Sequence, residues 1–116
     1  MNVSQDKPSI RFVGQADFAS EVLQSGKPVL AVFIAPWSRP CQVLEATLNE
    51  VVTACDGRVE LEIVKINADD NPGLSLWYDI QSVPTLLYFV GGRVQAKIIG
   101  TASKDAILAK LNLIKS

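Results

Sequence analysis

VLAVFIAPWSRPC, at residues 29–41, joins an apolar run to a polar loop that ends in a cysteine. The run at 29–35 lacks polar alternation, which is typical of a strand buried on both faces of a sheet. Apolar residues at 41–55 then recur at helical spacing, which predicts a helix. A helix start offers free backbone N–H groups and the positive end of the helix dipole, both of which stabilise a thiolate. This stretch is therefore a candidate reactive site.

The rest of the chain alternates predicted strands and helices. Strands are predicted at 10–13, 29–35, 59–66, 85–90 and 93–99, and helices at 17–24, 41–55, 74–78 and 103–114. The pair Gly91-Gly92 predicts a tight hairpin between the last two strands. The earlier strand–helix–strand units predict parallel pairing with right-handed crossovers. We expect an α/β fold with helices on both faces of a mixed sheet, in one domain at 1–116 with a loosely ordered leader at 1–9.

The composition argues against several classes of function. The 116 residues contain no histidine, which removes Cys–His and Ser–His nucleophile pairs. With only two cysteines as soft ligands, we expect no metal site, and we expect no cofactor. The net charge of −1 gives no electrostatic reason for binding nucleic acid. We see neither a membrane span nor a signal segment, and expect a cytoplasmic monomer or weak dimer.

Four groups of residues, taken in this order, resemble the thioredoxin family. They are residues 35–41 (the redox loop), 65–72, Val83-Pro84-Thr85, and Gly91-Gly92 with Gly100. The resemblance runs from about Ile10 to Ile114 and implies a central five-stranded mixed sheet, four flanking helices and a cis bond between Val83 and Pro84. It also implies a groove for a protein or extended peptide, formed by Trp37, Ser38, Arg39, Pro40, Val83, Pro84, Ile99, Gly100 and Thr101.

Two departures from the family pattern fall at chemically coupled positions. The family motif is Trp-Cys-Gly-Pro-Cys, and the position of its nucleophilic first cysteine is Ser38 here. The family's buried Asp, which moves a proton to and from the second cysteine, corresponds to Val32, while the neighbouring lysine is retained as Lys65. Exchange by two thiols needs an attacking and a resolving cysteine, so it cannot run within this motif. Cys41 remains as the candidate catalytic residue.

The residues of the motif each have a structural and a functional interpretation. We expect Ser38 to cap the helix by accepting a backbone hydrogen bond, with ligand binding as the alternative. Cys41 is expected to be a buried, apolar-like side chain, with a nucleophile that forms mixed disulfides as the alternative. Cys55 is expected to be structural. It lies about 21 Å from Cys41 along a helix, whereas a disulfide needs Cα atoms within about 7 Å.

Three further residues leave open questions. Lys65, without a carboxylate at position 32, either reaches water or finds another partner. Trp37 is expected to form a wall of the groove rather than plain core. Of Trp77 and its neighbour in the predicted short helix, Tyr78, we expect one to lie in the core and the other to mark a contact surface.

These observations support three hypotheses of function. The favoured one is a thioredoxin-like protein that keeps the groove for binding and has lost dithiol exchange. The second is a thiol–disulfide oxidoreductase that works as a monothiol through Cys41. The third is a Cys-to-Ser variant, at Ser38, of an active thioredoxin involved in cell redox homeostasis. A single change at Ser38 would not explain Val32, which favours natural divergence.

Overall fold

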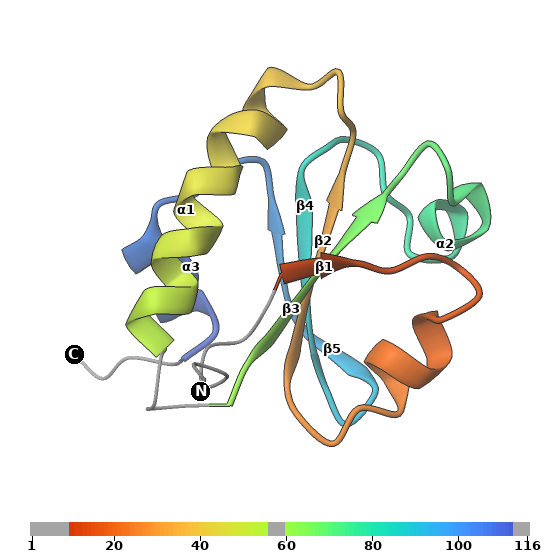
Figure 1. Ribbon diagram of the computed structural model, residues 1–116, viewed down its shortest axis with the longest axis horizontal. Coiled ribbons are helices and arrows are strands. Elements are labelled where there is room, and N and C mark those ends of the chain that lie inside the picture. The colour runs from red at the N-terminus through yellow and green to blue at the C-terminus, as the bar shows by residue number, and fades with distance from the viewer. Residues whose placement is uncertain (1–9, 56–59, 113–116) are drawn as a thin grey trace, which may run out of the picture.

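A five-stranded mixed sheet forms the centre of the computed structural model, which describes residues 10–55 and 60–112 (Figure 1). Its elements are β1 (Ile10–Phe12), η1 (Ala19–Leu23), β2 (Val29–Ile34), α1 (Arg39–Cys55), β3 (Glu62–Asn67), α2 (Pro72–Trp77), β4 (Thr85–Val90), β5 (Arg93–Ile99) and α3 (Lys104–Lys110). The strand order is β1-β3-β2-β4-β5. The first three of these strands are parallel, and β4 and β5 run antiparallel to their neighbours. The predicted α/β class and mixed sheet are confirmed.

The strand β2 lies at the middle of the sheet, and every one of its residues is buried. Its side chains alternate between two apolar clusters. Leu30 and Val32 belong to the cluster that includes α1 and α3, whereas Ala31 and Phe33 belong to the cluster that includes η1 and α2. Figure 1 shows α1 and α3 on one side of the sheet and α2 on the other. The apolar run in the sequence therefore reflects a strand covered on both faces.

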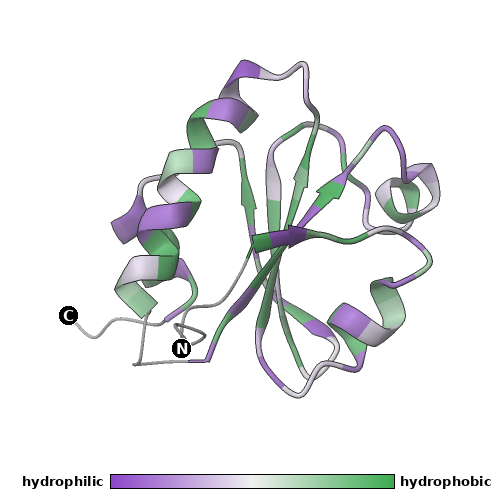
Figure 2. Cartoon of the chain, viewed as in Figure 1, coloured by the Kyte–Doolittle hydropathy of each residue, from purple (hydrophilic) through white to green (hydrophobic). Residues whose placement is uncertain are grey.

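Helix α1 packs one apolar face on the sheet. The buried residues of α1 are Cys41, Leu44, Leu48, Val51, Val52 and Cys55, the set predicted from helical spacing. Figure 2 shows apolar colouring along the central strands and both apolar and polar bands along α1. This amphipathic pattern fixes which side of α1 faces the core, and so fixes the direction in which the loop before α1 points.

The first predicted helix is instead a single π-helical turn. The backbone N–H of Gln24 donates to the carbonyl oxygen of Ala19, a five-residue separation, and the turn begins after Phe18 rather than at a capping Asp17. Phe18 and Val22 are buried against the sheet, so packing of these two side chains sets the local geometry. The described residues thus contain three α-helices and this turn, where four helices were expected.

Several element ends also differ from the predictions, and α1 begins at Arg39 and α2 at Pro72, each two residues earlier than expected. Strand β3 begins at Glu62 because its pairing with β2 begins there, with Val29 opposite Glu62. Helix α3 ends at Lys110. The leader at 1–9, the predicted strand start at 59 and the predicted burial of Ile114 lie outside the described residues.

Candidate functional site

The loop between β2 and α1 carries the predicted motif, and Ser38 caps the helix that follows. The backbone N–H of Cys41 donates to Ser38 Oγ at 3.4 Å, and the N–H of Ser38 donates to the carbonyl oxygen of Ala35 at 3.1 Å. Ser38 is buried, and Arg39 and Pro40 beside it are exposed. Pro40 occupies the first turn, where the absence of an N–H leaves no helical bond unmade. The predicted capping role of Ser38 is found in the structure.

Cys41 lies beneath this loop, with only 4% of its surface exposed. It belongs to the same apolar cluster as Val32 and Leu44. Cys55, at the other end of α1, is also buried, and both cysteines are free. A nucleophilic role for Cys41 therefore requires a partner sulfur to reach a sheltered thiol.

Glu45 is the carboxylate that pairs with Lys65 in the absence of an acid at position 32. Val32 and Lys65 are opposite one another in neighbouring strands. Lys65 Nζ lies 2.6 Å from Glu45 Oε2 and 4.6 Å from the centre of the Phe12 ring, and its side chain is only 12% exposed. Lys65 thus reaches a partner on α1 rather than water, which resolves the question left open by the sequence.

Sequence reasoning missed Glu45, although a signal for it exists. Glu45 follows Cys41 by four residues, and residues four apart lie on the same side of a helix. A lysine predicted under the start of that helix invites a search for an acid at such a position. The unpaired Lys65 was recognised, but its partner was not.

A cis peptide bond between Val83 and Pro84 shapes the second segment of the candidate site, as predicted. The backbone N–H of Gly100 donates to the carbonyl oxygen of Pro84 at 2.8 Å. Gly100 has a φ of 89°, in the left-handed region that favours glycine, which lets the chain turn after β5. The segments around Pro84 and Ile99 to Thr101 are therefore side by side, with Ile99 exposed.

The loop before α1 and the cis-proline segment adjoin the same apolar cluster. Val83 packs against the apolar cluster that contains Cys41, so the cis-proline segment and the start of α1 share one side of the core. Trp37 is largely exposed, and its Nε1–H donates to Asp69 Oδ2 at 2.8 Å. This bond directs one edge of the indole toward the loop before α2. The predicted site residues thus fall into a motif segment and a cis-proline segment, and Cys41 and Val83 adjoin the same apolar cluster.

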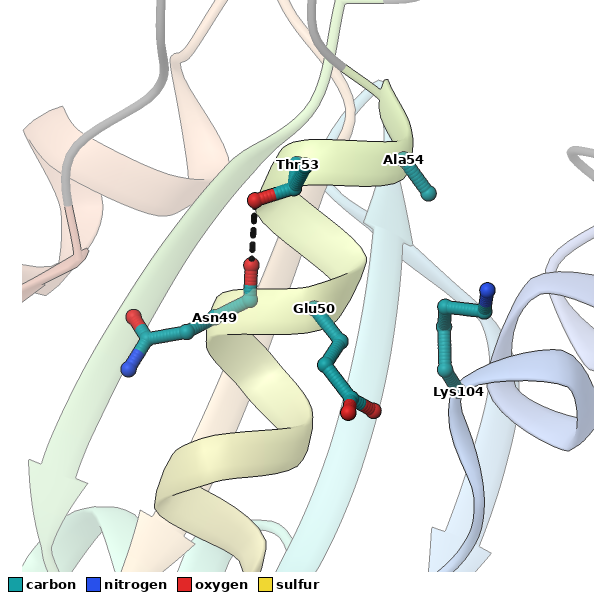
Figure 3. A pocket seen from close by; sticks show the side chains of 5 residues that line it. All are labelled: Asn49, Glu50, Thr53, Ala54 and Lys104. Carbon is teal, nitrogen blue, oxygen red and sulfur yellow. Dashed lines mark hydrogen bonds between the residues drawn. The ribbon is translucent and has the colours of Figure 1, made fainter.

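A separate hollow lies near the other end of α1. It has a volume of about 430 Å³ and is lined by Asn49, Glu50, Thr53, Ala54 and Lys104. Figure 3 shows Glu50 of α1 and Lys104 of α3 on either side of it. The hydroxyl of Thr53 donates to the carbonyl oxygen of Asn49 at 3.1 Å, so this hydroxyl is used within the helix. None of the predicted site residues lines this hollow.

The part of the chain that the structure describes holds no helix long and apolar enough to cross a membrane. Over the same residues, no group of three or more His, Cys, Asp or Glu side chains is placed to hold a metal ion.

Comparisons with known proteins give the class of protein that this fold and motif define. The thioredoxin family model matches residues 9–113. A thioredoxin of Griffithsia pacifica is 37% identical over 103 residues, which cover 89% of this chain and 93% of that protein. A thioredoxin of Synechocystis sp. is 36% identical, over 85% of this chain and 91% of its own. A thioredoxin of Mycobacterium tuberculosis is 35% identical, over 97% of this chain and 94% of its own.

The chain belongs to the thioredoxin family. Its sheet and helices form the thioredoxin fold, as the resemblance implied. Family membership supports a role in thiol–disulfide chemistry, and so favours the oxidoreductase hypotheses over pure binding.

Proposed function

We propose that this chain is a thiol–disulfide oxidoreductase of the thioredoxin type that works through the single thiol of Cys41. The observation that carries the proposal is the retained start of α1, where Cys41 follows a capped helix end in a chain whose relatives over nearly its full length are thioredoxins. The start of a helix presents free N–H groups and the positive end of the helix dipole toward an incoming partner.

The reaction proceeds in two exchange steps. The Cys41 thiolate attacks one sulfur of a disulfide in a partner protein, so that a mixed disulfide forms and the partner's second sulfur leaves as a thiolate. A second thiol then attacks the partner's sulfur in the mixed disulfide, and Cys41 leaves as a thiolate. A thiol of the partner itself thereby forms a rearranged disulfide within the partner, whereas a small thiol such as glutathione forms a partner–glutathione disulfide that a second small thiol reduces, giving the oxidised small thiol. Ser38 supplies only a hydroxyl, and the chain offers no histidine to activate it.

The partner is held as an extended segment between Trp37 and the cis-proline segment. Trp37 and Ile99 are large, exposed side chains, one in the motif segment and the other beside the cis-proline segment. The hydrogen bond from the Gly100 N–H to the Pro84 carbonyl oxygen joins these two chain segments and fixes the backbone of the region. A fixed backbone with apolar contacts on either side suits an extended peptide that carries a cysteine.

A second candidate function is peptide binding without exchange. The specific observations in its favour are the burial of Cys41 and the apolar Val32 at the position of the family's proton-moving acid. In this alternative the groove is retained while Cys41 acts as a small core side chain.

Trapping of the mixed disulfide separates the two candidates. A peptide whose single cysteine is blocked with thionitrobenzoate would be mixed with the intact chain, and adducts mapped by mass spectrometry. We expect an adduct on Cys41 with release of coloured thionitrobenzoate. The Cys41→Ala variant should lose the adduct, and Cys55→Ala, which removes an equally buried thiol far from the loop, should keep it.

An absence of adduct on Cys41 would contradict the exchange reaction. If the same peptide then still quenched or shifted the tryptophan fluorescence in the unmodified chain but not in Trp37→Ala, the result would support binding without exchange.

A further inference from the structure

Helix α2 carries large apolar side chains that the fold leaves uncovered. Leu76 is 84% exposed and Trp77 is 80% exposed, whereas Leu74 on the same helix is buried. Tyr78, next in the chain, packs its ring 5.5 Å from that of Phe89 in the core. Helix α2 is therefore anchored by one face, and the exposure of Leu76 and Trp77 is not needed for its packing.

A hollow lies beside Leu76, and its charged lining residues, Asp69 and Asp79, are acidic. It has a volume of about 520 Å³, and its lining includes Asp69, Leu76, Asp79 and Gln81. Gln81 Nε2 donates to Asp79 Oδ1 at 2.7 Å, and Trp37 donates to Asp69, so the hollow borders the exchange motif. We call this hollow together with Leu76 and Trp77 the α2 surface.

The α2 surface has negative charge that no ion pair within the described residues neutralises. Residues 67–82 contain Asp69, Asp70 and Asp79 and no lysine or arginine. Within residues 10–55 and 60–112, none of these three carboxylates forms an ion pair; the acidic partners in the ion pairs there are glutamates and Asp105. Unpaired carboxylates around exposed apolar side chains favour an oppositely charged, partly apolar ligand.

We propose that the α2 surface docks a segment of a partner protein in which an apolar side chain stands next to lysine or arginine. The apolar side chain contacts Leu76 in the hollow, and the cations meet Asp69 and Asp79. The exposed ring of Trp77 adds a face over which a lysine or arginine is attracted. Aromatic and apolar anchors with a charged rim are the usual composition of a protein contact surface.

Docking at the α2 surface does not use the thiol of Cys41. It therefore stands apart from the exchange reaction proposed above, and a chain that fails to form mixed disulfides can still dock such a segment. The hydrogen bond from Trp37 to Asp69 makes the two regions neighbours, so one partner can reach both.

The test is a titration of the ¹⁵N-labelled intact chain with three synthetic peptides that lack cysteine. All three share Gly-Ser flanks, and their centres are Lys-Leu-Lys, Glu-Leu-Glu and Lys-Gly-Lys. We expect the Lys-Leu-Lys peptide to shift the amide signals of Leu76, Asp79 and Gln81 and to bind at least about fivefold more tightly than either other peptide. Raising the ionic strength should weaken that binding, because exposed charges are screened.

Variants isolate the charges and the apolar contact. The double variant Asp69→Asn and Asp79→Asn should weaken the Lys-Leu-Lys peptide about fivefold, and Leu76→Ser should do the same. Asn at position 69 can still accept the bond from Trp37. Asp105→Asn removes one exposed carboxylate on α3 and should leave binding unchanged. All of these side chains are exposed, so circular dichroism should show the fold intact.

Four results would overturn the proposal. The first is equal binding of the Glu-Leu-Glu peptide, and the second is no shift at millimolar peptide. The third is shifts confined to Val83 and Gly100, which would place the peptide in the groove instead. The fourth is concentration-dependent self-association that shifts the same α2 signals without peptide, which would make a second copy of the chain the occupant.

Discussion

The two ends of α1 each bury one cysteine, but they place it in different surroundings. Cys41 is 4% exposed and Cys55 is 3% exposed, so burial does not distinguish them. Cys41 lies at the end where backbone N–H groups point outward and where Ser38 caps the helix. At the other end, desolvation raises the pKa of the Cys55 thiol above its ordinary value. The comparison teaches that two equally buried thiols have different surroundings: Cys41 follows a capped helix start, whereas burial of Cys55 disfavours its thiolate.

Restoring a second thiol at the N-terminal end of α1 is expected to change the rate of disulfide reduction more than any other substitution changes its own measured quantity. Ser38→Cys creates an attacking cysteine three residues before Cys41, so the dithiol cycle becomes possible. Reduction of a protein disulfide, with dithiothreitol as the electron source, should rise by roughly a hundredfold over the unmodified chain. The apolar Val32 should hold the rate below that of a thioredoxin with an acid there.

The matched control places two cysteines at the same three-residue spacing at the C-terminal end of α1. Val52→Cys gives two cysteines three residues apart with Cys55, and we expect no gain in disulfide reduction. Equal rates in the two variants would contradict the argument from helix position. An inactive Ser38→Cys variant would favour the binding-only candidate, whereas full thioredoxin activity in Ser38→Cys would favour the hypothesis of a Cys-to-Ser variant.

A smaller effect, on stability, is expected from removing the carboxylate of Glu45 near the N-terminal end of α1. Glu45→Gln removes the charged partner of Lys65, whose side chain is mostly buried. The free energy of unfolding, measured with urea, should fall by about 1 kcal/mol, since Glu45 itself is half exposed and part of its attraction is screened.

Glu50→Gln is the matched change on the same helix. Glu50 is exposed and has no ion pair among the described residues, so its replacement should alter the unfolding free energy by less than about 0.5 kcal/mol. If the two variants were equally stable, the pair between Glu45 and Lys65 would be of no consequence for the fold.

Much of this site follows from local sequence, and the remainder depends on contacts between distant segments. The burial of β2 and the apolar face of α1 follow from periodicity, and the cap by Ser38 follows from its place before a helix. The pair of Glu45 with Lys65 joins a helix to a strand, so no local pattern contains it. Likewise the sequence could not say which of Trp77 and Tyr78 faces the core, because adjacent residues in a short helix carry no periodic signal.

The smallest expected effect is a pH dependence of the free energy of unfolding that arises from Cys55 and appears only in alkaline solution. Its ordinary pKa of 9.0 is raised in the folded chain by desolvation, so the unfolded chain releases this proton at a lower pH than the folded one. Between those two values the unfolded state binds fewer protons, and the free energy of unfolding must therefore fall as pH rises. Well below the ordinary pKa of 9.0, at about pH 7, the thiol is protonated in both states and contributes no slope.

The slope should be measured by urea unfolding between about pH 8 and pH 10 in the intact chain and in variants. Tyr78 and Tyr88, whose pKa values burial also raises from 10.0, add a slope of the same sign toward the upper end of this range, so the contribution of Cys55 is the difference between the intact chain and Cys55→Ala. Cys55→Ala should flatten the fall in stability over this range. Cys41→Ala removes a buried thiol at the other end of α1 and should leave the contribution of Cys55 in place. An unchanged slope in Cys55→Ala would mean that burial does not penalise the thiolate of Cys55, and the contrast between the two ends of α1 would then rest on the capped N-terminal end alone.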